Sequence, residues 1–189
     1  KWYPAIAKDN VELVTGAVER VTPRGVIGAD GVEREVDAIV FGTGFEVTDI
    51  PAARFITGRD GRGLQDVWHG SPNALNGATI PGFPNLFMLL GPNTGLGHSS
   101  MVFVIESQVQ YVREALRTMR LNDYACVEPT EAAFAAWNAD LQTRMARTVW
   151  STGGCSSWYL DQHGRNTTLW PRTTFVLRRL LRTFDVRSY

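Results

Sequence analysis

The stretch that decides the fold is GPNTGLGHSS at residues 91–100, between an apolar run at residues 86–90 and an amphipathic pattern that begins at Ser99. This order predicts a strand, a glycine-rich turn and the N-terminus of a helix. Such a turn directs unpaired backbone N–H groups and the positive end of a helix dipole toward one place. Small residues let an electron-rich ligand approach the backbone there. A tight turn without a ligand is the alternative; the candidate binding residues are Gly91, Pro92, Asn93, Thr94, Gly95, Leu96 and Gly97.

A second apolar run, Asp37–Phe41, ends in Gly42, Thr43 and Gly44 and predicts a strand buried on both faces. In open α/β sheets, ligands bind beyond the carboxyl ends of parallel strands. We therefore expect the turns at residues 42–44 and 91–97 side by side at one sheet edge. Neither turn has the GxGxxG spacing of a dinucleotide-binding loop, so a complete dinucleotide site is not expected by that route.

The remaining pattern predicts an α/β chain with a short antiparallel β-meander and C-terminal helices. The first 45 residues read as short strands, with a hairpin turn at residues 29–31. Residues 46–84 are rich in turn formers, and residues 85–90 read as a second buried strand. Apolar stripes predict helices over residues 99–120 and from N-cap Thr130 to Val149, and a final helix is expected over 173–183. Two short strands are expected between the second and third helices, at residues 156–160 and 166–170.

Composition limits the function classes. The 189 residues are 44% hydrophobic and 20% charged with zero formal net charge, which fits a globular protein and gives no reason to expect nucleic acid. No apolar run reaches the length of a membrane span, and no signal peptide opens the chain. Cys126 and Cys155 match no zinc or disulfide pattern, which favours reduced thiols in a cytoplasmic protein. Because Lys1 does not look like a natural start, we expect a fragment.

No conventional catalytic constellation is present. His69, His98 and His163 stand alone in sequence, no pair of them predicts a metal site, and Cys155 has no evident activating base. Of the three histidines, only His98 is considered as a ligand contact, because it lies beside the expected helix N-terminus. The helix dipole disfavours a protonated imidazole there, so His98 would contact the ligand in its neutral form. We therefore assign no catalytic residue and no metal ligand, and expect any chemistry to be that of a cofactor.

The C-terminus is rich in arginine. Its only acid is Asp185, and its arginines are Arg165, Arg172, Arg178, Arg179, Arg182 and Arg187. Two interpretations stay open: a solvated basic face, or a patch that faces an anionic partner such as a phosphate-bearing cofactor or an acidic domain.

Three segments resemble flavin-containing and Baeyer–Villiger monooxygenases. DAIVFGTGF at residues 37–45 and PNLFMLLGPNTG at residues 84–95 are similar to flavin-enzyme elements of this family. CSSWYLD at 155–161, continued by GRNTTLWP at 164–171, resembles the C-terminal pattern of one bacterial branch. The three segments stand in the family's order and extend over most of the chain.

The resemblance implies part of a glutathione-reductase-type, Rossmann-like FAD/NAD(P)-binding fold. Residues 1–45 would be the end of the nicotinamide domain and the crossover strand, and residues 46–189 the C-terminal part of the FAD-binding domain. The turn at Gly42, Thr43 and Gly44 would lie where the chain crosses from the nicotinamide domain back to the flavin domain. Residues 90–97 would pass the ribityl chain and the N1–C2=O edge of the flavin, with Asn93 near the ribityl hydroxyls. The N–H groups of residues 94–97 would then face the flavin edge that becomes negative on reduction.

The implied parent enzyme uses FAD, NADPH and O2 to insert one oxygen into a small organic substrate: a ketone, an amine or a sulfide. Its N-terminal FAD and NADPH regions are expected outside this chain, so the chain alone should lack activity and tight FAD binding. One alternative is another two-domain NAD(P)H flavin oxidoreductase. The alternative from another class is a non-catalytic interaction domain, including a homodimer formed through the aromatic loops and the arginine-rich C-terminus.

Overall fold

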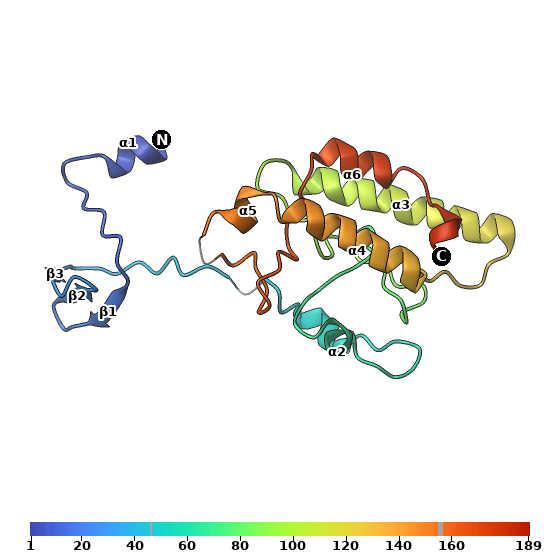
Figure 1. Cartoon of the computed structure of the whole chain (residues 1–189), viewed down its shortest axis with the longest axis horizontal. Helices are drawn as coiled ribbons and strands as arrows, with labels where there is room; N and C mark the ends of the chain where they lie inside the picture. Colours follow the sequence, from blue (N-terminus) through green and yellow to red (C-terminus); the bar gives the residue numbers. More distant parts are fainter. Residues whose placement is uncertain (46, 155–156) are drawn as a thin grey trace. The chain divides into compact units, whose positions relative to one another are not determined.

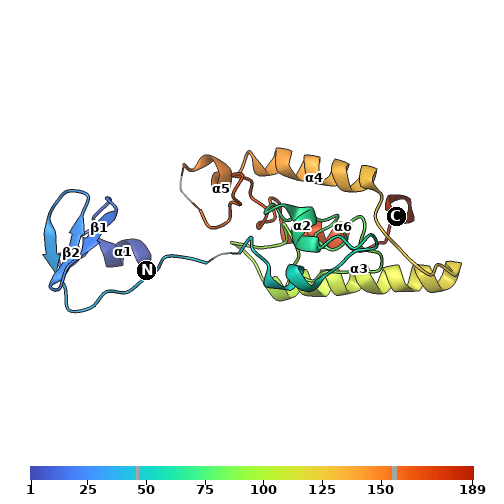
Figure 2. The same cartoon turned by 90° about the horizontal axis from the view of Figure 1, so that it is seen from below.

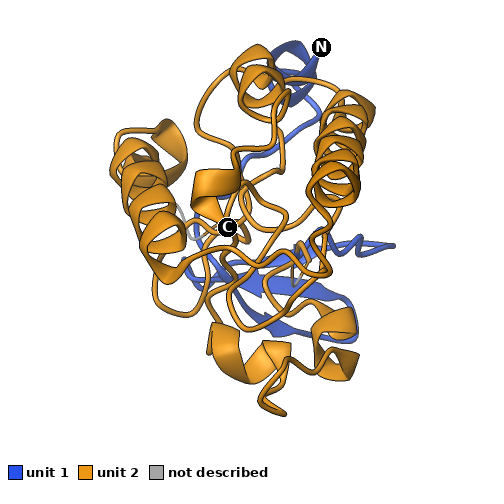
Figure 3. Ribbon diagram, turned by 90° about the vertical axis from the view of Figure 1, so that its right-hand side faces the viewer, with its two compact units in different colours: residues 1–43 blue, residues 44–189 orange. Residues whose placement is uncertain are grey.

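A computed structural model describes residues 1–45, 47–154 and 157–189. The chain forms two compact units, Lys1–Thr43 and Gly44–Tyr189, which Figure 3 shows in separate colours. The sequence-based division lay after residue 45. The assignment of the two parts to a nicotinamide and a flavin domain stays a prediction.

Unit 1, Lys1–Thr43, contains the expected antiparallel meander. Its sheet has the order β1-β2-β3, with antiparallel pairs throughout, and consists of β1 (Val18–Val21), β2 (Gly25–Gly28) and β3 (Glu33–Glu35). The turn falls at residues 29–31 as expected: Gly31 has φ 73° and donates its amide to the carbonyl of Gly28 at 2.9 Å. A short helix, α1 (Trp2–Ile6), was not expected, and residues 11–14 form no strand.

The buried strand predicted at Asp37–Phe41 is wrong. These residues have no regular secondary structure, Val40 is 93% exposed and Phe41 is 76% exposed. Within the described part of the chain, no backbone hydrogen bond is made by residues 37–41. A strand is stable only where a neighbouring strand satisfies its N–H and C=O groups. The apolar pattern thus indicated a tendency to be buried without showing that a partner lies in this chain.

Unit 2, Gly44–Tyr189, is built around long helices. α3 (Met101–Asn122) and α4 (Glu131–Met145) confirm two predictions, including Thr130 as the N-cap of α4, whose side chain accepts from the amide of Ala133 at 3.3 Å. α6 (Thr174–Leu180) confirms the third. The other elements are η1 (Pro51–Phe55), α2 (Leu64–Trp68), α5 (Val149–Thr152) and η2 (Val186–Ser188). Figures 1 and 2 both show α6 beside α3.

α4 ends earlier than the apolar stripe predicted. Thr148 has the extended backbone of an N-cap, with ψ 154°, and starts the separate helix α5. Its hydroxyl donates to the carbonyl oxygen of Met145 at 2.8 Å, which helps to close α4 at that residue. Val149 therefore leaves the stripe and is 70% exposed.

Residues 85–90 are not the predicted second buried strand. Asn85 has φ 61° and Leu90 has φ 53°, so both ends of the segment leave the extended conformation. The amide of Leu90 donates to Oε1 of Gln108 at 2.8 Å rather than to a neighbouring strand. A helix side chain has therefore taken the place of a strand partner.

In place of the two short strands expected near the C-terminus, the structure has single β-bridges. Leu160 and Asn166 form one antiparallel bridge across a turn in which Gly164 has φ 74°. Leu169 forms a parallel bridge with Gly95. Ser156, where the first strand was expected to start, lies outside the described residues.

Two apolar clusters hold unit 2 together. The first joins α3, α4 and α6 and contains Ala78, Val104, Tyr111, Leu141, Trp170, Leu177 and Leu181. The second lies under the loop-rich segment and contains Ala53, Leu64, Trp68, Ala74, Ile80 and Phe83. Figure 2 shows α3 and α4 on opposite sides of these loops. The glycine turn before α3 is thereby held between helices and the C-terminal loops.

Candidate functional site

The glycine turn at residues 91–97 is paired with the C-terminal segment at residues 166–170. The amide of Asn93 donates to the carbonyl oxygen of Thr167, and the amide of Gly95 to that of Thr168, each at 2.8 Å. The amide of Trp170 returns a bond to the carbonyl oxygen of Gly95, also at 2.8 Å. Two segments that carry the family resemblance are thus adjacent in space, and we call this pairing the clamp.

Asn93 is part of the clamp. Its side chain is 4% exposed, and its Nδ2 donates to the carbonyl oxygens of Asn166 at 2.8 Å and Leu169 at 3.0 Å. Its φ of 58° is a conformation that asparagine tolerates better than most residues. Both N–H groups of the amide are used within the chain, so only Oδ1 remains for the role near the ribityl hydroxyls, which stays a prediction.

The glycines of the turn have a structural reason. A Cβ on Gly91 would collide with the carbonyl oxygen of Gly77, and a Cβ on Gly95 would lie 2.7 Å from the carbonyl oxygen of Thr168. Packing of the chain against itself therefore requires glycine at both positions. The expectation that these glycines make room for a ligand stays a prediction, beside this packing requirement. At Gly97 the nearest atom to an added Cβ is Cζ2 of Trp150, at 3.0 Å.

The free amides are fewer than expected and lie further along the turn. Among the described residues, no hydrogen-bond acceptor faces the amides of Thr94, Leu96, Gly97 or His98. Thr94 is buried, whereas Gly97 and His98 are exposed just before α3, whose N-cap Ser100 makes no side-chain capping bond. The donors available to an electron-rich group are therefore the amides of residues 96–98, at the positive end of the α3 dipole.

An aromatic cluster lies beside these amides, and it was not assigned a role from sequence. Phe45 and Trp158 have ring centroids 6.1 Å apart, Trp158 and Tyr159 4.3 Å, and Trp150 and Tyr159 5.3 Å. Trp150 is 40% exposed, Trp158 43% and Phe45 77%. The sequence signal was the presence of Phe45, Trp158 and Tyr159 in the resembling segments.

The aromatic cluster connects two of the predicted turns within unit 2. A Cβ on Gly44 would lie 3.6 Å from Cδ1 of Trp158, and Gly97 contacts Trp150 at the other end of the cluster. Gly44 and Gly97 thus face one aromatic surface. Gly42 and Thr43 belong to unit 1, and a Cβ on Gly42 would have nothing within 4 Å.

Two buried polar atoms in the clamp have no partner. Asn166 is 2% exposed and Thr167 is 3% exposed, yet Nδ2 of Asn166 and Oγ1 of Thr167 have no hydrogen-bond partner among the described residues. Oδ1 of Asn166 is used, because it accepts from the amides of Thr168 and Leu169. Unsatisfied buried polar atoms are rare and often mark an ordered water or a ligand atom.

A serine–aspartate–histidine cluster elsewhere in unit 2 is structural. The Ser71 hydroxyl donates to Oδ2 of Asp161 at 2.5 Å, and Oδ1 accepts the amides of His163 and Arg165. The His163 ring faces the carbonyl of His69 at 3.1 Å instead of the serine. Among the described residues no histidine ring therefore faces the Ser71 hydroxyl, as a serine–histidine–aspartate triad requires.

Within the residues that the structure describes, no three histidine, cysteine, aspartate or glutamate side chains come together to hold a metal ion. No helix in the described ranges has the length and apolar character needed to cross a membrane.

Solved structures with the same arrangement define a class. A closed form of cyclohexanone monooxygenase matches 95% of this chain with a TM-score of 0.71 and 30% identity, using 35% of its own length. The complex of OTEMO with FAD and NADP matches 95% of this chain with a TM-score of 0.72 and 27% identity, again using 35% of its length. The chain therefore shares the fold of a part of these monooxygenases.

Curated relatives narrow the class to a family. The Baeyer–Villiger monooxygenase of Streptomyces coelicolor is 51% identical over all 189 residues of this chain, which span 36% of that protein. The Baeyer–Villiger monooxygenase of Pseudomonas aeruginosa is 48% identical, with the same coverage. No model of a protein family matches the chain. Over its whole length the chain is homologous to a part, about a third, of Baeyer–Villiger monooxygenases.

Proposed function

We propose that the chain is the C-terminal portion of an FAD- and NADPH-dependent monooxygenase of the Baeyer–Villiger type. The observation that carries this proposal is the identity of 51% over the whole chain, together with the clamp that joins two of the family-like segments. The parent enzyme would use NADPH and O2 to insert one oxygen into a small organic substrate, for which a ketone is the first choice.

The amides of the turn that would contact a flavin are those of residues 96–98, rather than residues 94–97 as the sequence suggested. The free amides of Leu96, Gly97 and His98 would hold an electron-rich edge, helped by the α3 dipole. The orphaned Nδ2 of Asn166 and Oγ1 of Thr167 offer two further polar contacts nearby, for an ordered water or for the cofactor. When bound, FAD with NADPH would supply the oxygen-activating chemistry that protein side chains lack.

The other residues of the site would hold the turn in position and shield the cofactor from water. The aromatic cluster of Phe45, Trp150, Trp158 and Tyr159 would exclude water and present an apolar wall to an organic substrate. The clamp would hold the turn rigid, because its hydrogen bonds fix the backbone on both sides of Thr94. Rigid donors need no reorganisation when charge develops in front of them.

The exposed apolar run at residues 39–41 would be completed by the longer protein. Ile39, Val40 and Phe41 are exposed in this chain, and a parallel neighbour from the remainder of the enzyme would give them the sheet that a Rossmann-like fold requires. Gly42, Thr43 and Gly44 would then lie at the end of that strand, where the chain passes between the nucleotide domains.

The test uses the complete reading frame that contains this chain. The purified product should be yellow with one flavin per chain, should oxidise NADPH faster when a ketone is added, and should form an ester that carries one atom of labelled dioxygen. A protein that oxidises NADPH without transferring oxygen to any organic substrate would favour another flavin oxidoreductase. A colourless protein that is dimeric through residues 130–189 would favour an interaction domain.

A matched pair of variants in the complete protein tests the turn itself. Gly97→Val inserts side-chain atoms where Trp150 already lies 3.0 Å from an added Cβ, beside the free amides. We expect at least about a tenfold loss of monooxygenase activity, the equivalent of ~1.4 kcal/mol. Gly61→Ala is the control for glycine replacement, since a Cβ there meets nothing within 4 Å; its φ of 75° should cost stability but not activity per folded molecule.

A further inference from the structure

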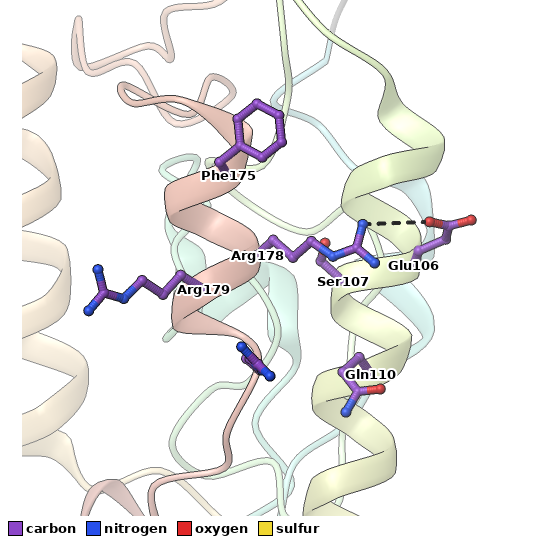
Figure 4. Close-up of a pocket in the computed structure, with 7 residues that line it drawn as sticks. Glu106, Ser107, Gln110, Phe175, Arg178 and Arg179 are labelled. Atoms are coloured by element: carbon purple, nitrogen blue, oxygen red, sulfur yellow. Dashed lines mark ion pairs between the residues drawn. The ribbon is translucent and has the colours of Figure 1, made fainter.

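A groove between α3 and α6 lies outside the candidate site. It has a volume of about 610 Å³, within the range of small-molecule sites, and is lined by Glu106, Ser107, Gln110, Phe175, Arg178, Arg179 and Arg182. Figure 4 shows Arg178 reaching from α6 toward Glu106 on α3, with Gln110 further along α3. The groove therefore has one wall from each helix.

The charges of the groove are not balanced within the chain. Three arginines and one acid, Glu106, line the groove, and Arg178 forms an ion pair of 4.0 Å with Glu106. Among the described residues no carboxylate forms an ion pair with Arg179 or Arg182. Two positive charges are thus left over, which suits a ligand with two negative charges such as a phosphate group.

The aromatic residues of the groove are arranged around Arg178. Its guanidinium lies 4.5 Å from the centroid of the Phe103 ring, and Phe175 meets that ring edge-on at 5.7 Å. This contact holds the planar donor fork of Arg178 in one orientation, which lowers the entropy lost on binding. Phe175 is 75% exposed, so its ring is available for stacking by a flat ligand.

A helix C-terminus favours cations, and Arg178 and Arg179 lie in the last turn of α6. This dipole effect explains the positive charge in the groove only in part. Arg182 follows the end of the helix, yet it lines the same groove. The dipole also gives no reason for an exposed phenylalanine beside the guanidinium groups.

We propose that this groove binds a nucleoside phosphate, with the phosphate held by Arg178 and Arg182 and the base stacked on Phe175. Arg179, which Figure 4 shows on the other side of α6 from Arg178, would act through its charge at the rim. Glu106 opposes the phosphate but also keeps Arg178 turned into the groove. The proposal does not depend on the monooxygenase activity.

The experiment is a calorimetric titration of the purified chain with ADP, inorganic pyrophosphate and adenosine. ADP should bind saturably, pyrophosphate more weakly and adenosine weakest, and added salt should weaken ADP binding. The double variant Arg178→Gln/Arg182→Gln should weaken ADP at least about tenfold. Arg120→Gln is a single-charge control outside the groove, because it removes one exposed charge at the end of α3 and should leave ADP binding unchanged.

Phe175→Ala separates stacking from charge. It should weaken ADP about fivefold and leave pyrophosphate binding unchanged. Circular dichroism of each variant should show the native helix signal. No saturable ADP binding, ADP binding that survives the double variant, or a preference for an acidic peptide over ADP would each overturn the proposal.

Discussion

Two apolar runs of this chain end in glycine turns, and they have opposite fates. In the run at residues 86–90, Met88 donates its amide to the carbonyl oxygen of Ala78 at 2.8 Å. The turn at 91–97 is tied to residues 166–170 by backbone bonds of 2.8 Å, and Asn93 is 4% exposed. The run at residues 37–41 makes no backbone hydrogen bond within the described part of the chain, and Val40 is 93% exposed. An apolar run thus indicates a segment that tends to be buried. Whether the chain also contains a segment that pairs with it or covers it depends on the rest of the sequence.

The largest contrast between the two regions should come from their aromatic residues. Trp170 is 5% exposed, bonds Gly95 through its amide and donates Nε1 to the carbonyl oxygen of Thr173 at 3.0 Å. Trp170→Ala should lower the free energy of unfolding of unit 2 by about 3–5 kcal/mol. Phe41→Ala, at a 76% exposed ring in unit 1, should change the free energy of unfolding of that unit by less than ~0.5 kcal/mol. Urea titration monitored by circular dichroism measures both, and equal effects would break the comparison.

Asn93 should be the next most sensitive position. Asn93→Ala removes the Nδ2 donor from the carbonyl oxygens of Asn166 and Leu169, of which Asn166 keeps a bond from Nε2 of Gln142 at 3.2 Å. It also puts alanine at a φ of 58°, which asparagine tolerates better. We expect a loss of about 2–4 kcal/mol in unfolding free energy. Asn93→Gly keeps the backbone relaxed and removes the same bonds, so it should recover only ~1 kcal/mol. Full recovery in the glycine variant would mean that the side-chain bonds are unimportant.

The two glycine turns can be compared directly by adding one methyl group to each. Gly95→Ala places Cβ 2.7 Å from the carbonyl oxygen of Thr168 and should cost about 1–3 kcal/mol. Gly42→Ala meets nothing within 4 Å and should stay within ~0.5 kcal/mol of the parent chain. Thermal unfolding of the two variants side by side gives the answer. A tolerated alanine at residue 95 would show that the clamp is looser than described.

The smallest effect concerns alkaline pH. Burial raises the pKa of Tyr111 and of Tyr189, whose hydroxyls are 2.7 Å apart. Their folded-state pKa values exceed the unfolded value of about 10, so the folded state holds its protons longer and stability is full below that pH. Above about pH 10 the unfolding free energy should fall, by at most ~1.4 kcal/mol per pH unit for each tyrosine. Tyr111→Phe should reduce this slope; an unchanged slope would contradict the account.

Local signals were sufficient for the helices α3, α4 and α6, but not for the short helices α1, α2 and α5. The apolar spacing of α3 and the N-cap Thr130 of α4 depend on neighbours within one or two turns, so both could be predicted from sequence. The break at Thr148 could not be predicted, because the apolar stripe continues through Val149 and gives no sign that Thr148 is extended. Both expected buried strands failed, since strand formation depends on partners far along the chain.

The sequence predicted the turn at residues 91–97 as a binding site, which stays a prediction, and it did not predict how the turn is packed. The turn at residues 91–97 does carry free amides, yet Gly91 and Gly95 are glycines because Gly77 and Thr168 approach them closely. The aromatic cluster joins Phe45 to Trp150 and Trp158, which are too distant in sequence for any spacing rule to connect.

Amide hydrogen exchange, measured residue by residue by NMR, tests the central claim most directly. We predict slow exchange at Asn93, Gly95 and Trp170, whose amides bond within the clamp, and fast exchange at Gly97 and Val40, whose amides do not. Protection at Gly97 would mean that the amide reserved for an electron-rich ligand is already bonded inside the protein, and would contradict the account.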